Sequence, residues 1–191
     1  LSITNYEPST SKKLAADLEN YNFENFQKLS DNGDITIGIG LPTKSIEGIK
    51  ISMMIFIPKK DPTIYSKQIL HVNEETYFVK GYKQILIDIK GLKVGIGICH
   101  EALQAEHINN VLKEGPHIYV ASVAKSKEGV NKAYKVFPRM ATDSNIPVLM
   151  CNSVGPCDNF MSYGCSTIWN KHGKELEKLT HNNQGLLIYD T

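Results

Sequence analysis

The sequence predicts an α/β fold that combines antiparallel strand pairs with strand–helix–strand units. Residues 34–41 alternate apolar side chains, residues 48–58 form a second strand, and the turn-rich segment between them predicts an antiparallel pair. Residues 83–99 hold a second pair, hinged at Lys90–Gly91. Beyond residue 99, helices and strands alternate, which is typical of layered α/β sheets.

The remaining elements are predicted in chain order. Residues 9–29 open with hydroxyl side chains that can cap a helix, and Leu14, Leu18 and Tyr21 keep helical spacing, so we expect one helix there. Pro138 should kink or divide the later of two further helices. The patterns after residue 99 predict helices over 106–115 and 129–145, and strands over 117–124, 146–155, 165–173 and 185–190.

Composition bounds the function. The chain has 191 residues, 41% of them hydrophobic and 21% charged, and a formal charge of +1, so we expect a single domain over residues 1–191. This charge favours neither nucleic acid nor an anionic membrane as partner, and no apolar run is long enough for a membrane span. Without a secretory pattern, we expect a cytoplasmic protein with reduced thiols. The four cysteines form no C-x-x-C pair, so we expect no metal.

Cys99 ends a strand whose two faces differ. Gly95, Gly97 and Cys99 share one face, which leaves room for a second layer or a ligand, while the other face is apolar. Ligands bind at this carboxyl end of strands in open α/β sheets. Two interpretations remain open on these residues alone. Cys99 is either a buried packing residue, as most free cysteines are, or a nucleophile. Lys67 is likewise either a surface charge or part of a site.

Five segments point to a family when they are read together. They follow one another as YSKQILHVNEETYFVKG (65–81), GLKVGIGICHEALQAEH (91–107), EGPHIYVASVAKS (114–126), PRMATDSNIPVLMCNSVG (138–155) and FMSYGCSTIWNKHGKEL (160–176). In this order they resemble the nitrilase, or carbon–nitrogen hydrolase, superfamily. The resemblance covers nearly the whole chain, and it implies an α-β-β-α sandwich of the nitrilase type.

The resemblance also implies roles for particular residues. The family works with a Glu–Lys–Cys triad, in which Cys99 would be the nucleophile and Lys67 the lysine that stabilises the oxyanion. Glu74 matches a second glutamate that supports the site, and Glu75 is the alternative if the register slips by one residue. The backbone N–H of His100 would be the other oxyanion donor.

The general base of the family is a glutamate that would precede Leu1. It lies immediately before a segment that LSITNYEP, residues 1–8, resembles, and Glu7 matches a position past it. We therefore expect an N-terminally incomplete chain that lacks the first strands and helix of the sandwich. We interpret Glu7 as a surface acid.

The expected activity is hydrolysis of a non-peptide carbon–nitrogen bond in a small amide, carbamoyl compound or nitrile. It would proceed through a thioester on Cys99, without a cofactor, and we take Ala124 as a candidate substrate-binding residue. The alternative is a non-catalytic binding or scaffold protein with the same fold. Family members commonly pair through helices, so we expect a homodimer or a multiple of dimers built on residues 106–115 and 129–145.

Overall fold

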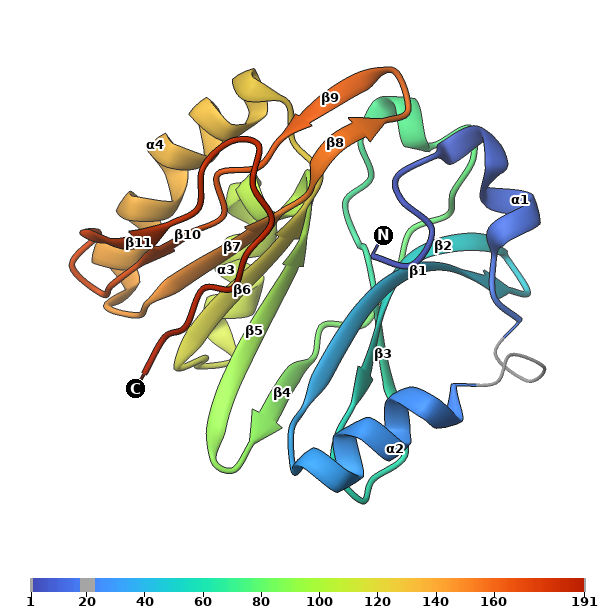
Figure 1. The fold of residues 1–191 in the computed structure, drawn as a ribbon, viewed down its shortest axis with the longest axis horizontal. Helices are drawn as coiled ribbons and strands as arrows, with labels where there is room; N and C mark the ends of the chain where they lie inside the picture. The colour runs from blue at the N-terminus through green and yellow to red at the C-terminus, as the bar shows by residue number, and fades with distance from the viewer. Residues whose placement is uncertain (1, 18–22, 191) are drawn as a thin grey trace. The chain divides into compact units, whose positions relative to one another are not determined.

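The computed structural model describes residues 2–17 and 23–190 and divides into two compact units, Leu1–Gln84 and Ile85–Thr191 (Figure 1). The predicted helical positions Leu18 and Tyr21 lie outside the described residues. The prediction of one domain over the whole chain stays a prediction.

The first unit is built on a three-stranded antiparallel sheet. Its order is β1-β2-β3, with β1 at Ile37–Ser45, β2 at Gly48–Phe56 and β3 at Thr63–Ser66. The predicted pairing of the first two strands is confirmed, and their ladder closes at Ser45 and Gly48. Helix α2 (Glu24–Gly33) covers this sheet, where the rings of Phe26 and Phe56 stack with centroids 5.6 Å apart.

The predicted single helix over residues 9–29 is wrong. A 3-10 turn, η1 (Pro8–Thr10), leads into the short helix α1 (Ser11–Leu14), and the backbone is extended at Ala15. Ala16 then pairs with β1 instead of continuing the helix: its N–H donates to Pro42 O at 2.9 Å, and its carbonyl accepts from Lys44 N at 2.9 Å. Sheet pairing therefore overrides the helical spacing in this segment.

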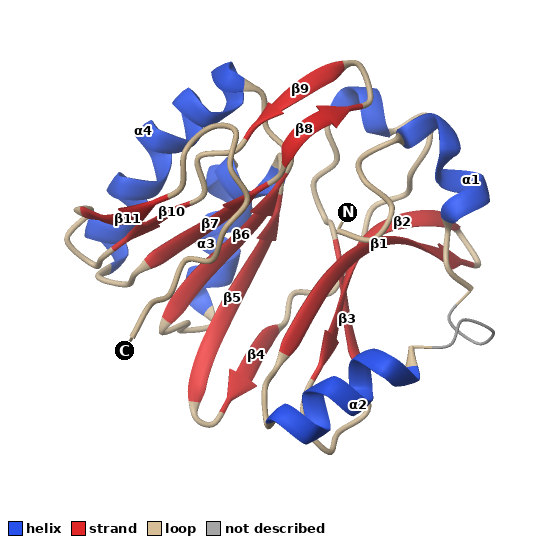
Figure 2. Ribbon diagram, in the orientation of Figure 1, coloured by secondary structure: helices blue, strands red, loops and turns tan. Residues whose placement is uncertain are grey.

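The second unit holds a six-stranded mixed sheet (Figure 2). Its three central strands are parallel and the outer ones are antiparallel, which confirms the predicted class. The order is β11-β10-β7-β6-β5-β4, with β4 at Leu86–Ile89, β5 at Leu92–Ile98, β6 at Ile118–Val123, β7 at Val148–Asn152, β10 at Thr167–Trp169 and β11 at Glu175–Lys178. A separate hairpin joins β8 (Val154–Cys157) to β9 (Phe160–Tyr163).

Two helices pack on one face of this sheet. They are α3 (Ala105–Lys113) and α4 (Lys127–Ser144), and a 3-10 turn, η3 (Glu101–Leu103), precedes them. The core beneath them includes Tyr119, Phe137 and Trp169, all at most 2% exposed. Pro138 does not divide α4, which continues to a left-handed C-cap at Asn145.

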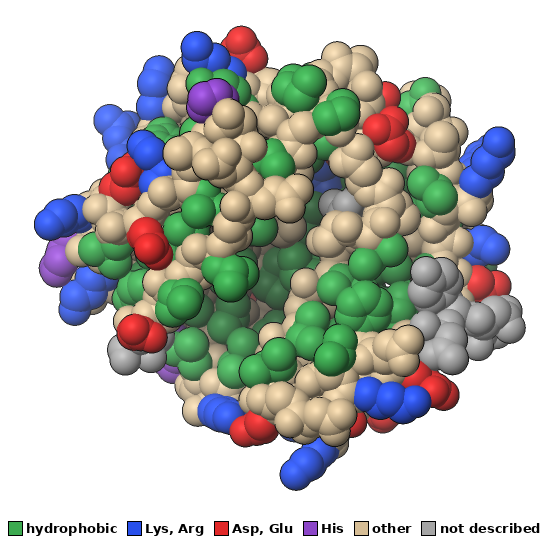
Figure 3. All heavy atoms as spheres, in the orientation of Figure 1, with side chains coloured by type: hydrophobic (Ala, Val, Ile, Leu, Met, Phe, Trp, Pro, Cys, Tyr) green, Lys and Arg blue, Asp and Glu red, His purple; other side chains and the backbone are tan. Residues whose placement is uncertain are grey.

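The predicted strand over residues 185–190 is wrong. No strand forms there, because no neighbouring strand pairs with it, and Leu186 and Ile188 are 87% and 72% exposed. In the described part of the chain, no helix is long and apolar enough to cross a bilayer. On the face shown in Figure 3, basic and acidic side chains are interspersed, as the near-neutral charge suggests.

Candidate active site

A buried ion pair joins Lys67 to Glu74 in the first unit. The ammonium Nζ of Lys67 lies 2.6 Å and 2.8 Å from the two carboxylate oxygens of Glu74, and the two residues are 1% and 2% exposed. Lys67 directly follows β3, and its backbone is fixed on both sides. Its N–H donates to Ile51 O at 2.8 Å, and its carbonyl accepts from Gly81 N at 2.7 Å. A side chain at Gly81 would collide with the carbonyl of Ser66, 2.3 Å from an ideal Cβ.

Glu74 belongs to a 3-10 turn, η2 (Val72–Glu74), that aims its carboxylate inward. The same carboxylate accepts the backbone N–H of His71 at 2.7 Å, which forms half of a capping box. It also accepts the hydroxyl of Tyr6 at 3.1 Å. Glu75 is exposed. Of the two glutamates that the sequence left open, Glu74 is therefore the partner of Lys67, whereas Tyr6 was not foreseen because it is 68 residues distant.

A buried ion pair contributes little net stability, because removing two charges from water costs about as much as their attraction returns. The ion pair therefore holds the Lys67 ammonium in one place more than it adds stability, which makes Lys67 a candidate site residue. Lysine and glutamate side chains are rarely buried this completely unless they are paired.

Cys99 has an unusual backbone in the second unit. It follows the last residue of β5 and has a left-handed φ of 52°, which side chains other than glycine rarely adopt. Its N–H still donates to Ser122 O of β6 at 2.9 Å, so the turn begins where the parallel pairing of β5 and β6 ends. The thiol Sγ lies 3.5 Å from the carbonyl oxygen of Ala124. Cys99 and Ala124 meet because their parallel strands end at the same sheet edge.

The glycine face of β5 is filled by a second protein layer. An ideal Cβ on Gly97 would lie 2.0 Å from the hydroxyl of Tyr119, and one on Gly95 would lie 2.5 Å from a methyl of Val111. Of the two uses expected for this face, second layer or ligand, the structure therefore shows the first. The glycines let the helical layer approach, and the thiol stands beyond them at the strand end.

Asn152, at the end of β7, fixes the loop that follows Ala124. Its side chain accepts the backbone N–H of Lys125 at 2.9 Å and donates to the carbonyls of Lys125 at 3.3 Å and Gly164 at 2.6 Å. This asparagine therefore connects two loops, next to the carbonyl that contacts the thiol.

Among the four cysteines, only Cys99 directly follows a central strand of the sheet. All four cysteines are free thiols: Cys157 is buried, Cys151 is exposed, and Cys165 is half-buried, also with a positive φ. Within residues 2–17 and 23–190, no group of three His, Cys, Asp or Glu side chains is placed to hold a metal ion.

The match to a family model decides the family. The model described as carbon-nitrogen hydrolase matches residues 1–191. The chain belongs to the carbon-nitrogen hydrolase family. It is thus an enzyme of carbon–nitrogen bond hydrolysis, as the resemblance implied. The comparison with curated proteins returned no match.

Solved structures confirm the nitrilase fold of this carbon-nitrogen hydrolase. Saccharomyces cerevisiae Nit3, a member of the nitrilase superfamily, is similar with a TM-score of 0.84 and 18% identity over 94% of this chain and 69% of that chain. XC1258 from Xanthomonas campestris is similar with a TM-score of 0.83 and 15% identity, over 94% of this chain and 71% of that chain. A mutant amidase from Nesterenkonia sp. AN1, in complex with butyramide, is similar with a TM-score of 0.77 and 17% identity, over 93% of this chain and 70% of that chain.

Proposed function

We propose that this enzyme cleaves a small amide, carbamoyl compound or nitrile through a thioester on Cys99. The observation that carries the proposal is the left-handed backbone of Cys99 at the end of a central strand. A strained turn from a strand presents the nucleophile in other hydrolases, and a cysteine thiolate is an effective one. One mutant of the similar Nesterenkonia amidase carries acrylamide added at its active-site cysteine, and another mutant is in complex with butyramide, which favours amides.

The reaction would take two steps on an amide. A general base, a glutamate in this family, takes the proton of the Cys99 thiol. The thiolate attacks the carbonyl carbon, and the electrons of the C=O bond move to oxygen. The tetrahedral intermediate collapses, the amine leaves with the proton from the base, and a thioester remains. Water, deprotonated by the same base, then attacks the thioester and releases the acid and the thiol.

Lys67 is proposed to stabilise the negative charge that develops on the substrate oxygen, together with the N–H of His100. A cation suits this role because its attraction to oxygen grows as the transition state forms. The carboxylate of Glu74, 2.6 Å from the ammonium, is proposed to hold Lys67 in one orientation. Ala124 is proposed to line the substrate site beside the thiol.

Ammonia release by the full-length protein tests the proposal. The substrates are aliphatic amides, ω-amides, carbamoyl amines and nitriles. With an active substrate, Cys99→Ala should lower kcat at least about 10³-fold, and mass spectrometry of the quenched wild type should show an acyl group on Cys99. Cys151→Ala, which removes an exposed thiol from β7, is the matched control and should keep full activity. Turnover by Cys99→Ala would refute the thioester mechanism.

A pair of adjacent glutamates provides a second matched comparison. Glu74→Gln should lower kcat by about 10- to 100-fold, because Lys67 loses a charged partner. The exposed Glu75→Gln should leave kcat unchanged. Equal effects of the two substitutions would contradict the assigned role of Glu74. If the folded full-length protein bound amides but turned none over, the scaffold alternative would replace the proposed activity.

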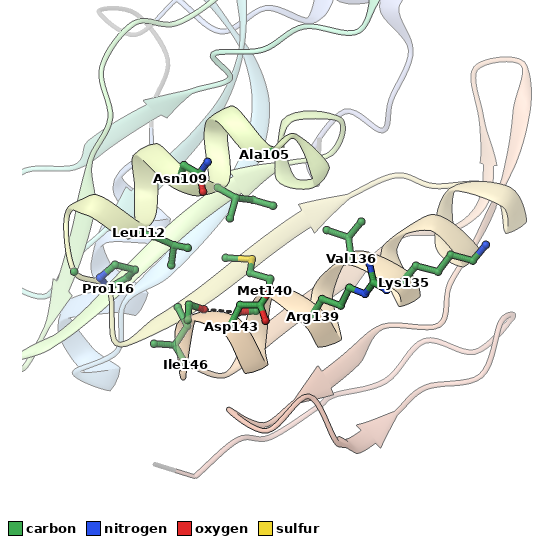
Figure 4. Close-up of a pocket in the computed structure, with 13 residues that line it drawn as sticks. Ala105, Asn109, Leu112, Pro116, Lys135, Val136, Arg139, Met140, Asp143 and Ile146 are labelled. Carbon is green, nitrogen blue, oxygen red and sulfur yellow. Dashed lines mark hydrogen bonds between the residues drawn. The ribbon is translucent and has the colours of Figure 1, made fainter.

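We also propose a homodimer through α3 and α4. A hollow of about 740 Å³ lies between these helices, and Figure 4 shows Leu112, Pro116, Met140 and Ile146 around it, with Arg139 along its side. A largely apolar groove of this kind suits the same helices of a second copy. Light scattering after size exclusion should give a dimer or a multiple of dimers, and Arg139→Asp, at an exposed position beside the hollow, should shift it to monomer. A monomeric wild type at micromolar concentration would refute this proposal.

A further inference from the structure

A chain of three buried polar side chains lies beneath the turn that carries Cys99. The carboxylate of Glu101 accepts the backbone N–H of Ile98 at 2.9 Å. The Nε2 atom of His107, on α3, lies 3.7 Å from the same carboxylate oxygen, and its Nδ1 lies 3.3 Å from the hydroxyl of Tyr119 on β6. All three side chains are at most 1% exposed. None of them belongs to the proposed triad.

Burial determines which groups of this chain carry protons. It lowers the pKa of His107 to about 4, so its imidazole is neutral near pH 7 and has one N–H. The carboxylate of Glu101 favours that proton on Nε2, which leaves Nδ1 as an acceptor. Burial, and secondarily the charge of Glu101, raise the pKa of Tyr119 well above its usual value, so its hydroxyl is the donor to Nδ1. The hydroxyl of Tyr119 therefore donates to His107, and the Nε2–H of His107 faces the Glu101 carboxylate across 3.7 Å.

The bond from Glu101 to Ile98 replaces a missing strand contact. β4 pairs with β5 only from Leu92 to Gly95, so β4 provides no partner for the amide of Ile98. The carboxylate of Glu101 accepts that amide, one residue before the left-handed turn at Cys99. A non-glycine residue persists in this conformation only where its surroundings hold it.

Gly97 leaves the space that this group of three polar side chains needs. The hydroxyl of Tyr119 lies 2.0 Å from where a Cβ on Gly97 would be, so any side chain there would displace it. The strand that presents Cys99 thus leaves space for the tyrosine that donates to His107.

Given Cys99 as the nucleophile of the proposed function, we propose that Glu101 is a positioning residue, whose carboxylate accepts the Ile98 amide and holds the Cys99 turn in its reactive geometry. His107 and Tyr119 keep that carboxylate in place. Glu101 touches no reacting atom. Its loss should therefore lower kcat and the reactivity of the thiol while substrate binding is retained.

The test uses the full-length protein and two readouts. Glu101→Ala removes the acceptor, whereas Glu101→Gln retains an oxygen for the Ile98 amide. We expect Glu101→Ala to lower kcat by about 10- to 100-fold, with KM changed less than about 3-fold. Glu101→Gln should retain most of the wild-type kcat. Tyr119→Phe should lower kcat by about 3- to 10-fold. Glu106→Gln, an exposed carboxylate on α3, is the matched control and should match wild type.

The second readout is the rate at which iodoacetamide alkylates Cys99, followed by mass spectrometry without any substrate. It should fall in Glu101→Ala and recover in Glu101→Gln. Wild-type kcat and alkylation rate in a folded Glu101→Ala, or equal losses in Glu101→Ala and Glu101→Gln, would overturn the positioning role. If Glu101→Ala does not fold, Tyr119→Phe decides: a lower kcat at constant KM supports the role, and an unchanged kcat overturns it. Turnover by Cys99→Ala would instead refute the proposed function, while the alkylation rates would still report on the turn.

Discussion

Acidification should destabilise the protein through the buried imidazole of His107. Burial lowers the pKa of His107 from an ordinary value of 6.5 to about 4 in the folded protein. Between these two values, the unfolded chain binds a proton that the folded chain does not. The free energy of unfolding therefore rises with pH across this window. The contribution of His107 is fully present above pH 6.5 and is lost as pH falls toward 4.

The size of this effect follows from the two pKa values. Relative to pH 7.5, the contribution of His107 lowers the free energy of unfolding by about 2 kcal/mol at pH 5 and by about 3 kcal/mol once the pH is below 4. Glutamine cannot titrate in this range, so His107→Gln should remove the contribution. The stability advantage of wild type over His107→Gln should therefore shrink by about 2 kcal/mol between pH 7.5 and pH 5.

Urea unfolding at the two pH values measures this difference. Trp169 is the only tryptophan of the chain and is 2% exposed, so its fluorescence reports on the core of the second unit. His172→Gln, an exposed histidine, is the control and should parallel wild type at both pH values. A stability difference between wild type and His107→Gln that is the same at pH 7.5 and pH 5 would refute the assignment of a buried, neutral imidazole.

Three substitutions test the packing around the site. Gly97→Ala should lower the free energy of unfolding by about 1–3 kcal/mol, since the new Cβ would meet the Tyr119 hydroxyl. Adding Tyr119→Phe should recover part of that loss in urea unfolding. Wild-type stability of Gly97→Ala would contradict this contact. Phe137→Ala should cost about 3–5 kcal/mol, because its ring is fully buried in the helix-covered core, and a cost below 1 kcal/mol would place the ring elsewhere. Lys67→Ala should lower the free energy of unfolding by about 3–5 kcal/mol, because the carboxylate of Glu74 stays buried without its cation. The exposed Lys44→Ala is the control and should change the urea midpoint little. Equal effects of the two substitutions would argue against the ion pair.

Local signals predicted the parts of the fold that local chemistry controls. The hinge at Lys90–Gly91 could be predicted because glycine readily adopts the positive φ that tight hairpin turns require. In the structure, the two residues have φ of 54° and 87°. The helix now seen as α4 was expected from its apolar spacing. Its limits are set by the hydroxyl of Ser126, which accepts from Gly129 N, and by the left-handed Asn145.

Long-range pairing explains the failures. Ala16 pairs with β1, whose backbone partners lie more than 25 residues away, and nothing local in the sequence reveals that. The strand predicted over residues 185–190 had the right composition but has no neighbour. In the candidate site, the resemblance supplied Cys99, Lys67 and Glu74, and the sequence left Glu74 and Glu75 unresolved until the structure showed which of them is buried.

The partners of the site residues were beyond the sequence for a similar reason. Tyr6 donates to Glu74 across 68 positions, and the contact of Tyr119 with His107 spans two elements. A lone tyrosine or histidine has no spacing that signals such a bond. Gly97 was the one available indication, because a glycine inside a strand marks the close approach of another group, which here is Tyr119.

The left-handed φ of Cys99 opposes heat resistance to the proposed nucleophilic role at the same position. Glycine would occupy that backbone without the crowding of a Cβ, which costs a non-glycine residue about 1–2 kcal/mol. A library selected only for folding should therefore enrich Cys99→Gly, a more heat-resistant protein that has lost its proposed nucleophile. Engineering of this enzyme toward higher melting temperature needs a simultaneous activity screen, or position 99 held fixed, since stability alone would select against the thiol.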